Sequence, residues 1–217
     1  MNNLSKRIIT SFFLLIVFLS CLFINKFTWL FLLIIVSIIS FFEIIKIFKK
    51  IFIKNFILYI VNFFALLYLA FFILSGYSLL EIGSKIFVLF IVSVCICSDV
   101  GGYIVGKSIG GKKLTKISPK KTISGSLGSL IFSLFPLGAL FFIKIENNVN
   151  FEYVSIISCL FISIFCQIGD LFISYFKRLS KVKDTGNILP GHGGILDRID
   201  GIIFVVPLLY LISFVIK

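Results

Sequence analysis

Long apolar runs, separated by short basic segments, make up most of the chain. Each run is near the length of about 20 residues that a helix needs to cross a bilayer. A lipid-exposed segment must satisfy its own backbone hydrogen bonds, and the alternation of polar and apolar residues typical of a β-barrel is absent, so these runs predict helices. We expect about seven transmembrane helices, within a range of six to eight, over residues 8–25, 28–45, 55–75, 86–106, 123–143, 153–173 and 200–216.

The composition supports this prediction of an all-α, polytopic membrane bundle. Hydrophobic residues make up 59% and charged residues 14% of the 217 positions, whereas soluble domains average about 45–50% and about 25%. Too little polar surface remains for a soluble enzyme or a nucleic-acid-binding domain, despite the net charge of +12. The five cysteines lie inside apolar runs, which indicates small buried residues rather than disulfides or a zinc site. The first run exceeds the apolar region of a signal peptide, so we expect it to remain as a span.

The distribution of basic residues predicts the orientation. If the N-terminus is cytoplasmic, all but four of the 21 basic residues fall in cytoplasmic segments. The positive-inside rule selects this arrangement. We therefore expect a multi-pass protein of the cell's inner (plasma) membrane, with residues 1–85 as N-terminal helices and residues 86–217 as a catalytic region whose loops 107–122 and 174–199 face the cytoplasm.

The first polar segment begins at the end of the predicted helix 86–106. Residues 101–108 match the G-x-x-x-x-G-K-S pattern of a phosphate-binding loop, but that loop requires a preceding strand in a soluble α/β unit. Close helix packing, or a break at a ligand, explains the glycines better. Asp99 interrupts an apolar stretch, which indicates either a functional carboxylate or an ion pair that joins helices. A candidate anion site follows, with contact to lipid head groups as the alternative: Ser118, Lys120, Lys121 and Thr122.

The second polar segment gathers charged residues around a glycine-rich turn. Asp197 and Asp200 are three residues apart, so on a helix they share a face and can bind one cation together with Asp170. Carboxylates without thiols suit magnesium, which is bound jointly with substrate phosphates. His192, the only histidine, is a structural residue, a general acid or base, or a phosphate donor. The remaining candidates for this site are Lys177, Arg178, Lys183, Asp184 and Arg198, with Gly193 and Gly194 allowing backbone amides to approach an anion.

These two segments resemble the signature of the phosphatidate cytidylyltransferases (CDP-diacylglycerol synthases). The chain departs from the family's usual Thr-Trp-Glu-Gly at Thr122–Gly125, where Ser124 replaces the glutamate, and at Val100 and Gly102. The matching residues are Asp99, Tyr103, Gly106, Ser118–Thr122, Ser174–Arg178, Lys183, Asp184, Gly186, Leu189, Pro190, His192–Gly194 and Asp197–Asp200.

The resemblance implies transfer of CMP from CTP to phosphatidate, which forms CDP-diacylglycerol and pyrophosphate in phospholipid biosynthesis and requires magnesium. A second cation and a homodimer are left open, membrane lipids are expected partners, and nucleic acid is not. Another membrane phosphotransferase is the alternative enzyme, but the four-aspartate motif of the CDP-alcohol phosphatidyltransferases is missing. An anion transporter is the non-enzymatic alternative, but internal repeats typical of transporters are not visible.

Overall fold

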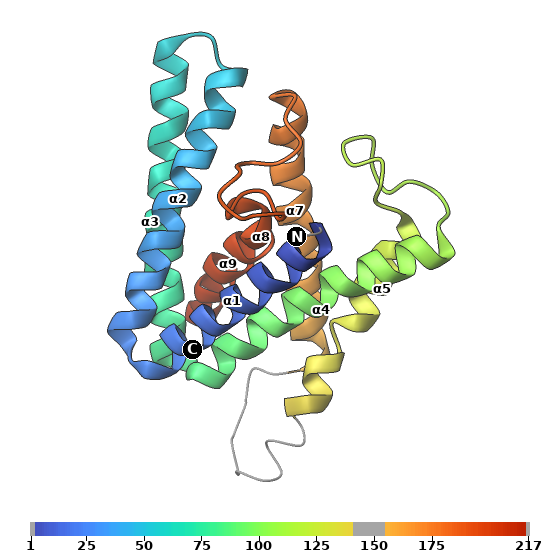
Figure 1. The fold of residues 1–217 in the computed structure, drawn as a ribbon. Coiled ribbons are helices and arrows are strands. Elements are labelled where there is room, and N and C mark those ends of the chain that lie inside the picture. Colours follow the sequence, from blue (N-terminus) through green and yellow to red (C-terminus); the bar gives the residue numbers. More distant parts are fainter. Residues whose placement is uncertain (1–2, 141–154, 216–217) are drawn as a thin grey trace.

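The computed structural model describes residues 3–140 and 155–215, which form a bundle of helices (Figure 1). These two ranges contain no β-strand and only two isolated bridges, Lys113–Thr122 and Leu189–Gly193. The predicted all-α fold is confirmed. The helices are α1 (Asn3–Ile24), α2 (Lys26–Ile51), α3 (Asn55–Gly83), α4 (Lys85–Ile109), α5 (Ile123–Phe132), α7 (Ile156–Leu179), α8 (Leu196–Ile199) and α9 (Ile202–Val215).

Six helices in the described ranges are long and apolar enough to cross a membrane. They correspond to the first six predicted spans, although residues 141–143 and 153–154 of those predictions lie outside the description. The six segments are Ser5–Ile24, Lys26–Ile51, Asn55–Gly83, Lys85–Ile109, Ile123–Leu140 and Ile156–Leu179.

The seventh predicted span, 200–216, differs in the structure. Helix α9 has 14 residues from Ile202 to Val215, about 21 Å at 1.5 Å per residue, which is less than the hydrocarbon thickness of about 30 Å. Its start lies two residues after the predicted one, because Asp200 and Gly201 form a turn between the short helix α8 and α9. Residue 216 lies outside the description.

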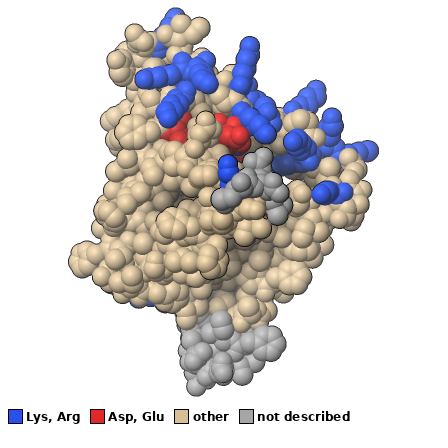
Figure 2. Space-filling model, in the orientation of Figure 1, with Lys and Arg blue, Asp and Glu red and all other residues tan. Residues whose placement is uncertain are grey.

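The helices run up and down, so the basic segments gather at one end of the bundle. In Figure 1 the start of α1, the loop between α4 and α5 and the loop before α8 lie at the same end. Figure 2 shows lysine and arginine side chains over that end, with acidic side chains directly beneath them. We call it the basic end.

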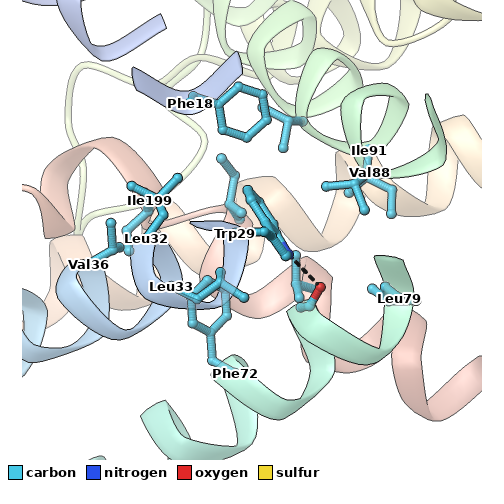
Figure 3. A pocket seen from close by; sticks show the side chains of 14 residues that line it. Phe18, Trp29, Leu32, Leu33, Val36, Phe72, Leu79, Val88, Ile91 and Ile199 are labelled. Carbon is cyan, nitrogen blue, oxygen red and sulfur yellow. Dashed lines mark hydrogen bonds between the residues drawn. The ribbon is translucent and has the colours of Figure 1, made fainter. Parts of the chain in front are cut away.

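The interior of the bundle beneath the basic end is packed with apolar side chains. A small cavity of about 110 Å³ lies among them, and Figure 3 shows Phe18, Trp29, Phe72 and Ile91 around it. The Trp29 indole N–H donates to the Gly76 carbonyl at 2.9 Å and thereby ties α2 to α3 (Figure 3). This part of the molecule is a core, and the polar chemistry lies at the basic end.

Glycines allow α4 and α5 to approach backbone to backbone. A Cβ added at Gly101 would overlap Phe132 and lie 2.7 Å from the Gly128 carbonyl oxygen. A Cβ at Gly128 would lie 2.9 Å from the Gly101 carbonyl oxygen. Residues 101–108 are helical throughout. The interpretation of these glycines as packing residues, rather than as a phosphate-binding loop, is confirmed.

Candidate functional site

A cavity of about 570 Å³ opens at the basic end between α4, α5, α7 and the loop after α4. Its volume is within the range of about 300–1,000 Å³ that is usual for small-molecule sites. We call it the α4–α7 cavity. Predicted site residues from both polar segments line it: Asp99, Ser118, Lys120, Lys121, Thr122 and Asp170.

The two aspartates of the α4–α7 cavity lie on neighbouring helices, Asp99 on α4 and Asp170 on α7. Ser98 and Ser163 share a hydrogen bond of 2.8 Å, which joins α4 to α7 beside Asp99. Ser174 donates to Asp170 at 3.3 Å, and Lys121 forms an ion pair with Asp170 across the cavity. The predicted meeting of Asp99 and Asp170 in one polar cavity is therefore confirmed, whereas their chemical roles stay predictions.

Thr122 has a local structural task in addition to lining the cavity. Its side chain accepts from the Gly125 amide at 3.1 Å and so caps the start of α5. Its hydroxyl also contacts the Ser124 hydroxyl at 3.0 Å, and Ser124 donates to the Gly110 carbonyl. Ser124, at the position of the family's usual glutamate, thus closes the loop onto the end of α4.

A second polar cavity, of about 460 Å³, lies beside the glycine-rich turn, and we call it the His192 cavity. The structure therefore divides most of the predicted site residues between two cavities. Arg178 is exposed near the end of α7. The predicted site residues that line neither cavity are Lys177, Arg178, Gly194, Asp197 and Asp200. The charged and imidazole side chains around the His192 cavity are Arg7, Lys183, Asp184, His192 and Arg198.

Helix α1 holds the imidazole of His192 at both ring nitrogens. Thr10 Oγ1 lies 2.5 Å from Nδ1, and Ser11 Oγ lies 3.2 Å from Nε2. Arg7 donates to the Gly191 carbonyl at 2.9 Å. Burial, followed by the positive charges of Arg198 and Arg7, lowers the pKa of His192. The sequence analysis missed these α1 contacts, because no local pattern pairs the first helix with a loop near residue 190.

Asp197 is the centre of a hydrogen-bond network. Its Oδ1 binds Lys177 Nζ at 2.8 Å, and its Oδ2 accepts from the amides of Thr185 at 2.8 Å and Gly194 at 3.0 Å. Burial raises the pKa of Asp197, but the bonds from Lys177, Thr185 and Gly194 outweigh it and the pKa is lowered. The predicted metal ligand thus has both oxygens occupied by donors from the protein.

Asp200 has the opposite surroundings. It lies in the turn between α8 and α9, where burial, followed by the negative charges of Asp170 and Asp99, raises its pKa well above the usual range. Among the residues that the structure describes, no three His, Cys, Asp or Glu side chains form a group that could hold a metal ion. The predicted ligand set Asp170, Asp197 and Asp200 is therefore not assembled, while Asp170 and Asp200 remain neighbours.

The turn that precedes α8 depends on backbone conformation and on close contacts. Gly193 has φ of 85°, in the region that favours glycine. A Cβ on Gly194 would overlap Thr185 and lie 2.6 Å from Oε1 of Glu43. The two predicted glycines are therefore required by the shape of the turn, whichever ligand it binds.

The sequence analysis missed Glu43. This residue of α2 has 1% of its surface exposed, and it accepts from the Ile195 amide at 3.0 Å and the Leu196 amide at 2.9 Å. The signal was available, since Glu43 lies inside the predicted span 28–45, where a carboxylate is as costly as the one at Asp99.

Comparisons with known proteins agree with the resemblance found in the signature residues. A family model described as "Cytidylyltransferase family" matches residues 55–216. The chain is 48% identical over 114 residues to the phosphatidate cytidylyltransferase of Bacillus subtilis (strain 168), covering 52% of this chain and 42% of that protein. The protein of the same name from Rickettsia bellii (strain RML369-C) is 46% identical over 121 residues, covering 53% of this chain and 52% of that protein. The chain spans about half the length of the curated relatives it matches.

Proposed function

The chain belongs to the cytidylyltransferase family, and we propose that it transfers CMP from CTP to phosphatidate, forming CDP-diacylglycerol and pyrophosphate. One observation carries the proposal: two polar cavities with acidic and basic walls lie at one end of an otherwise apolar, membrane-spanning bundle. A lipid phosphate and a water-soluble polyanion can meet only at such a boundary. The proposal includes the inner membrane as location and the basic end as its cytoplasmic face.

In the proposed reaction a phosphate oxygen of phosphatidate attacks the α-phosphorus of CTP. The bond between the α-phosphorus and the bridging oxygen to the β-phosphate breaks, and that oxygen leaves with pyrophosphate. Phosphatidate supplies the nucleophile, so the protein provides positioning and charge neutralisation. Lys120 and Lys121 in one cavity, and Lys183 and Arg198 in the other, are placed to bind the phosphates.

Magnesium fits the carboxylates of Asp170 and Asp200 better than the three-aspartate set. Magnesium is usually bound by one or two carboxylates together with substrate phosphates, and it would neutralise charge on the phosphates. Asp200 is buried and lies beside the carboxylates of Asp170 and Asp99; burial first, and then these negative charges, raise its pKa, and a cation there would offset the repulsion between the carboxylates. Asp197, whose pKa is lowered by its donors from the protein, positions Lys177 and the turn instead.

The test is an assay of the purified protein in detergent with phosphatidate and CTP labelled at the α-phosphorus. We expect the label to enter CDP-diacylglycerol, one pyrophosphate to be released per product, and the reaction to require magnesium. Asp99→Asn should lower turnover by at least about tenfold, and Glu81→Gln, at the other end of the bundle, should not change it. A folded wild-type protein that forms no labelled lipid product would overturn the proposal.

A further inference from the structure

Glu43 is the one acidic residue of α2, and its carboxyl group bonds to the glycine-rich turn that precedes α8 rather than to its own helix. It is 1% exposed, and its partners lie 142 to 153 residues further along the chain. Burial of a carboxyl group in a membrane bundle is costly unless hydrogen bonds compensate. Such a residue calls for a task that a leucine could not perform.

Every contact of the Glu43 carboxyl group with this turn comes from a donor. Oε1 accepts from the Ile195 amide at 3.0 Å, and Oε2 accepts from the Leu196 amide at 2.9 Å and is 2.7 Å from the Thr185 hydroxyl. The same hydroxyl lies 3.0 Å from Oδ2 of Asp197. A side chain that only accepts fits this position, whereas an amide would direct its own N–H groups at one of the donors.

Two signature glycines leave room for the Glu43 carboxyl group. A Cβ on Gly186 would lie 2.6 Å from Oε1 and 3.1 Å from Cδ of Glu43, and its three nearest atoms would all belong to that residue. A Cβ on Gly194 would also press on Oε1, at 2.6 Å. Gly186 and Gly194 therefore fit a turn that closes around this carboxyl group.

We infer that Glu43 is a positioning residue for the catalytic turn. Through Thr185 it is linked to Asp197, and through Asp197 to Lys177, while its bonds to Ile195 and Leu196 fix the start of α8. Helix α8 carries Arg198 and leads directly to Asp200. The inference rests on the proposed function, and it assigns to an N-terminal helix outside the matched range 55–216 a part in shaping the site.

The first test replaces Glu43 by Gln and measures turnover per folded molecule. A displacement of about 1 Å in a catalytic group can cost about a hundredfold in rate, and we expect a loss between tenfold and a hundredfold. The control is Ser40→Ala, which removes a buried hydroxyl one turn earlier on α2 that bonds only to the Val36 carbonyl. It should keep turnover within about twofold of wild type. Normal turnover of the folded fraction of Glu43→Gln would overturn the inference.

The second test perturbs the same contact from the side of the turn. Gly186→Ala should lower turnover, because its Cβ meets Glu43, but should have little further effect in a Glu43→Ala background. This variant decides the question if no Glu43 variant folds: an unchanged rate in folded Gly186→Ala would overturn the inference, and a loss of tenfold or more would support it.

Amide exchange separates failure of the inference from failure of the proposed function. In Glu43→Gln the amides of Ile195 and Leu196 should exchange at least tenfold faster than in Ser40→Ala, whatever reaction the protein catalyses. If the wild-type protein makes no CDP-diacylglycerol but exchange is faster in Glu43→Gln, the proposed reaction is rejected and Glu43 remains the residue that orders the turn. Unchanged exchange would reject the inference itself.

Discussion

Asp197 and Asp200 are three positions apart but have different neighbours. Asp197 receives hydrogen bonds from Lys177, Thr185 and Gly194, whereas Asp200 lies beside the carboxylates of Asp170 and Asp99. The side chain of Asp197 is 6% exposed, so its bonds are shielded from water. Substitution by asparagine should therefore have different effects on stability at the two positions.

We expect Asp197→Asn to lose about 2–4 kcal/mol of stability, because the substitution removes a buried negative charge and leaves the ammonium group of Lys177 without its counter-charge. Asp200→Asn should be as stable as wild type or more so, since it removes a charge from a group of like charges, while its turnover should fall at least tenfold. Thermal unfolding and activity measured on the same samples check both. Equal losses of stability in the two variants would contradict the distinction.

His192 offers a direct measurement, because it is the only histidine in the chain. Burial and the charges of Arg198 and Arg7 lower its pKa, so its ring should titrate below the usual value of about 6.5. The neutral form is favoured in the folded state, so the imidazole leaves stability unaffected above about pH 6.5. Stability should decrease as the pH falls from there through the folded pKa.

The imidazole resonances of the single histidine should report this titration by NMR. Arg7→Gln removes one of the two positive charges and should move the midpoint upward, while Lys26→Gln, at the opposite end of the bundle, should not. A midpoint at or above 6.5 in the wild-type protein would contradict the prediction.

The sequence shows which polar residues lie within apolar runs and so predicts candidate site residues, but it does not predict which of them pair. The spacing of Asp197 and Asp200 places them on one face of a helix, and the prediction that they bind one cation followed from this. The pairing of Asp197 with Lys177 depends instead on where α7 ends relative to α8, which no local pattern encodes. Glu43 was detectable by the same argument as Asp99, but its partners 142 to 153 residues away were not.

At the scale of helices, glycines set the distance between neighbours. Gly169 of α7 faces the turn before α9, and a Cβ there would lie 2.5 Å from the Asp200 carbonyl oxygen and 2.9 Å from Phe204. A backbone atom cannot yield as a flexible side chain can. The position of Asp200 is therefore fixed by helix packing as well as by its own side chain.

Gly169→Ala should displace α9 and lower both stability and turnover, with a stability loss of about 1–3 kcal/mol that is typical of overpacking. Gly138→Ala is the matched control, because a Cβ at that glycine would meet nothing within 4 Å. It should be neutral or slightly stabilising. The measurements are the melting temperatures and turnover rates of both variants. Equal values for the two variants would contradict the account of how α7 packs against the start of α9.

The prediction of helices from apolar runs was successful where each run is uninterrupted. The last helix starts two residues later than the predicted span 200–216, because Asp200 and Gly201 were counted with the apolar run that follows. In the structure these residues form the turn between α8 and α9. The apolar pattern marks residues that avoid water, and it does not distinguish one long helix from a turn and a shorter helix.

At the scale of the whole molecule, the sequence predicts how the protein is oriented in the membrane, and the fold is consistent with that orientation. The basic residues collect at one end, over the polar cavities (Figure 2). In a variant without cysteines, Lys116→Cys at the basic end should react with an impermeant thiol reagent only after cells are opened. Glu81→Cys, at the other end, should react in intact cells. Labelling of Lys116→Cys from outside would reverse the orientation.

The contact between Glu43 and Leu196 also bears on how the protein is made. Because the two residues are 153 positions apart, the ribosome has released the first helices into the membrane long before the partner of this carboxyl group exists. Until then Glu43 lacks the two backbone amides near residue 195 that receive it in the finished bundle. A nascent chain that stops short of α8 keeps a carboxyl group without these donors among apolar helices, so truncation after the first helices should destabilise α2 even though its own sequence is intact.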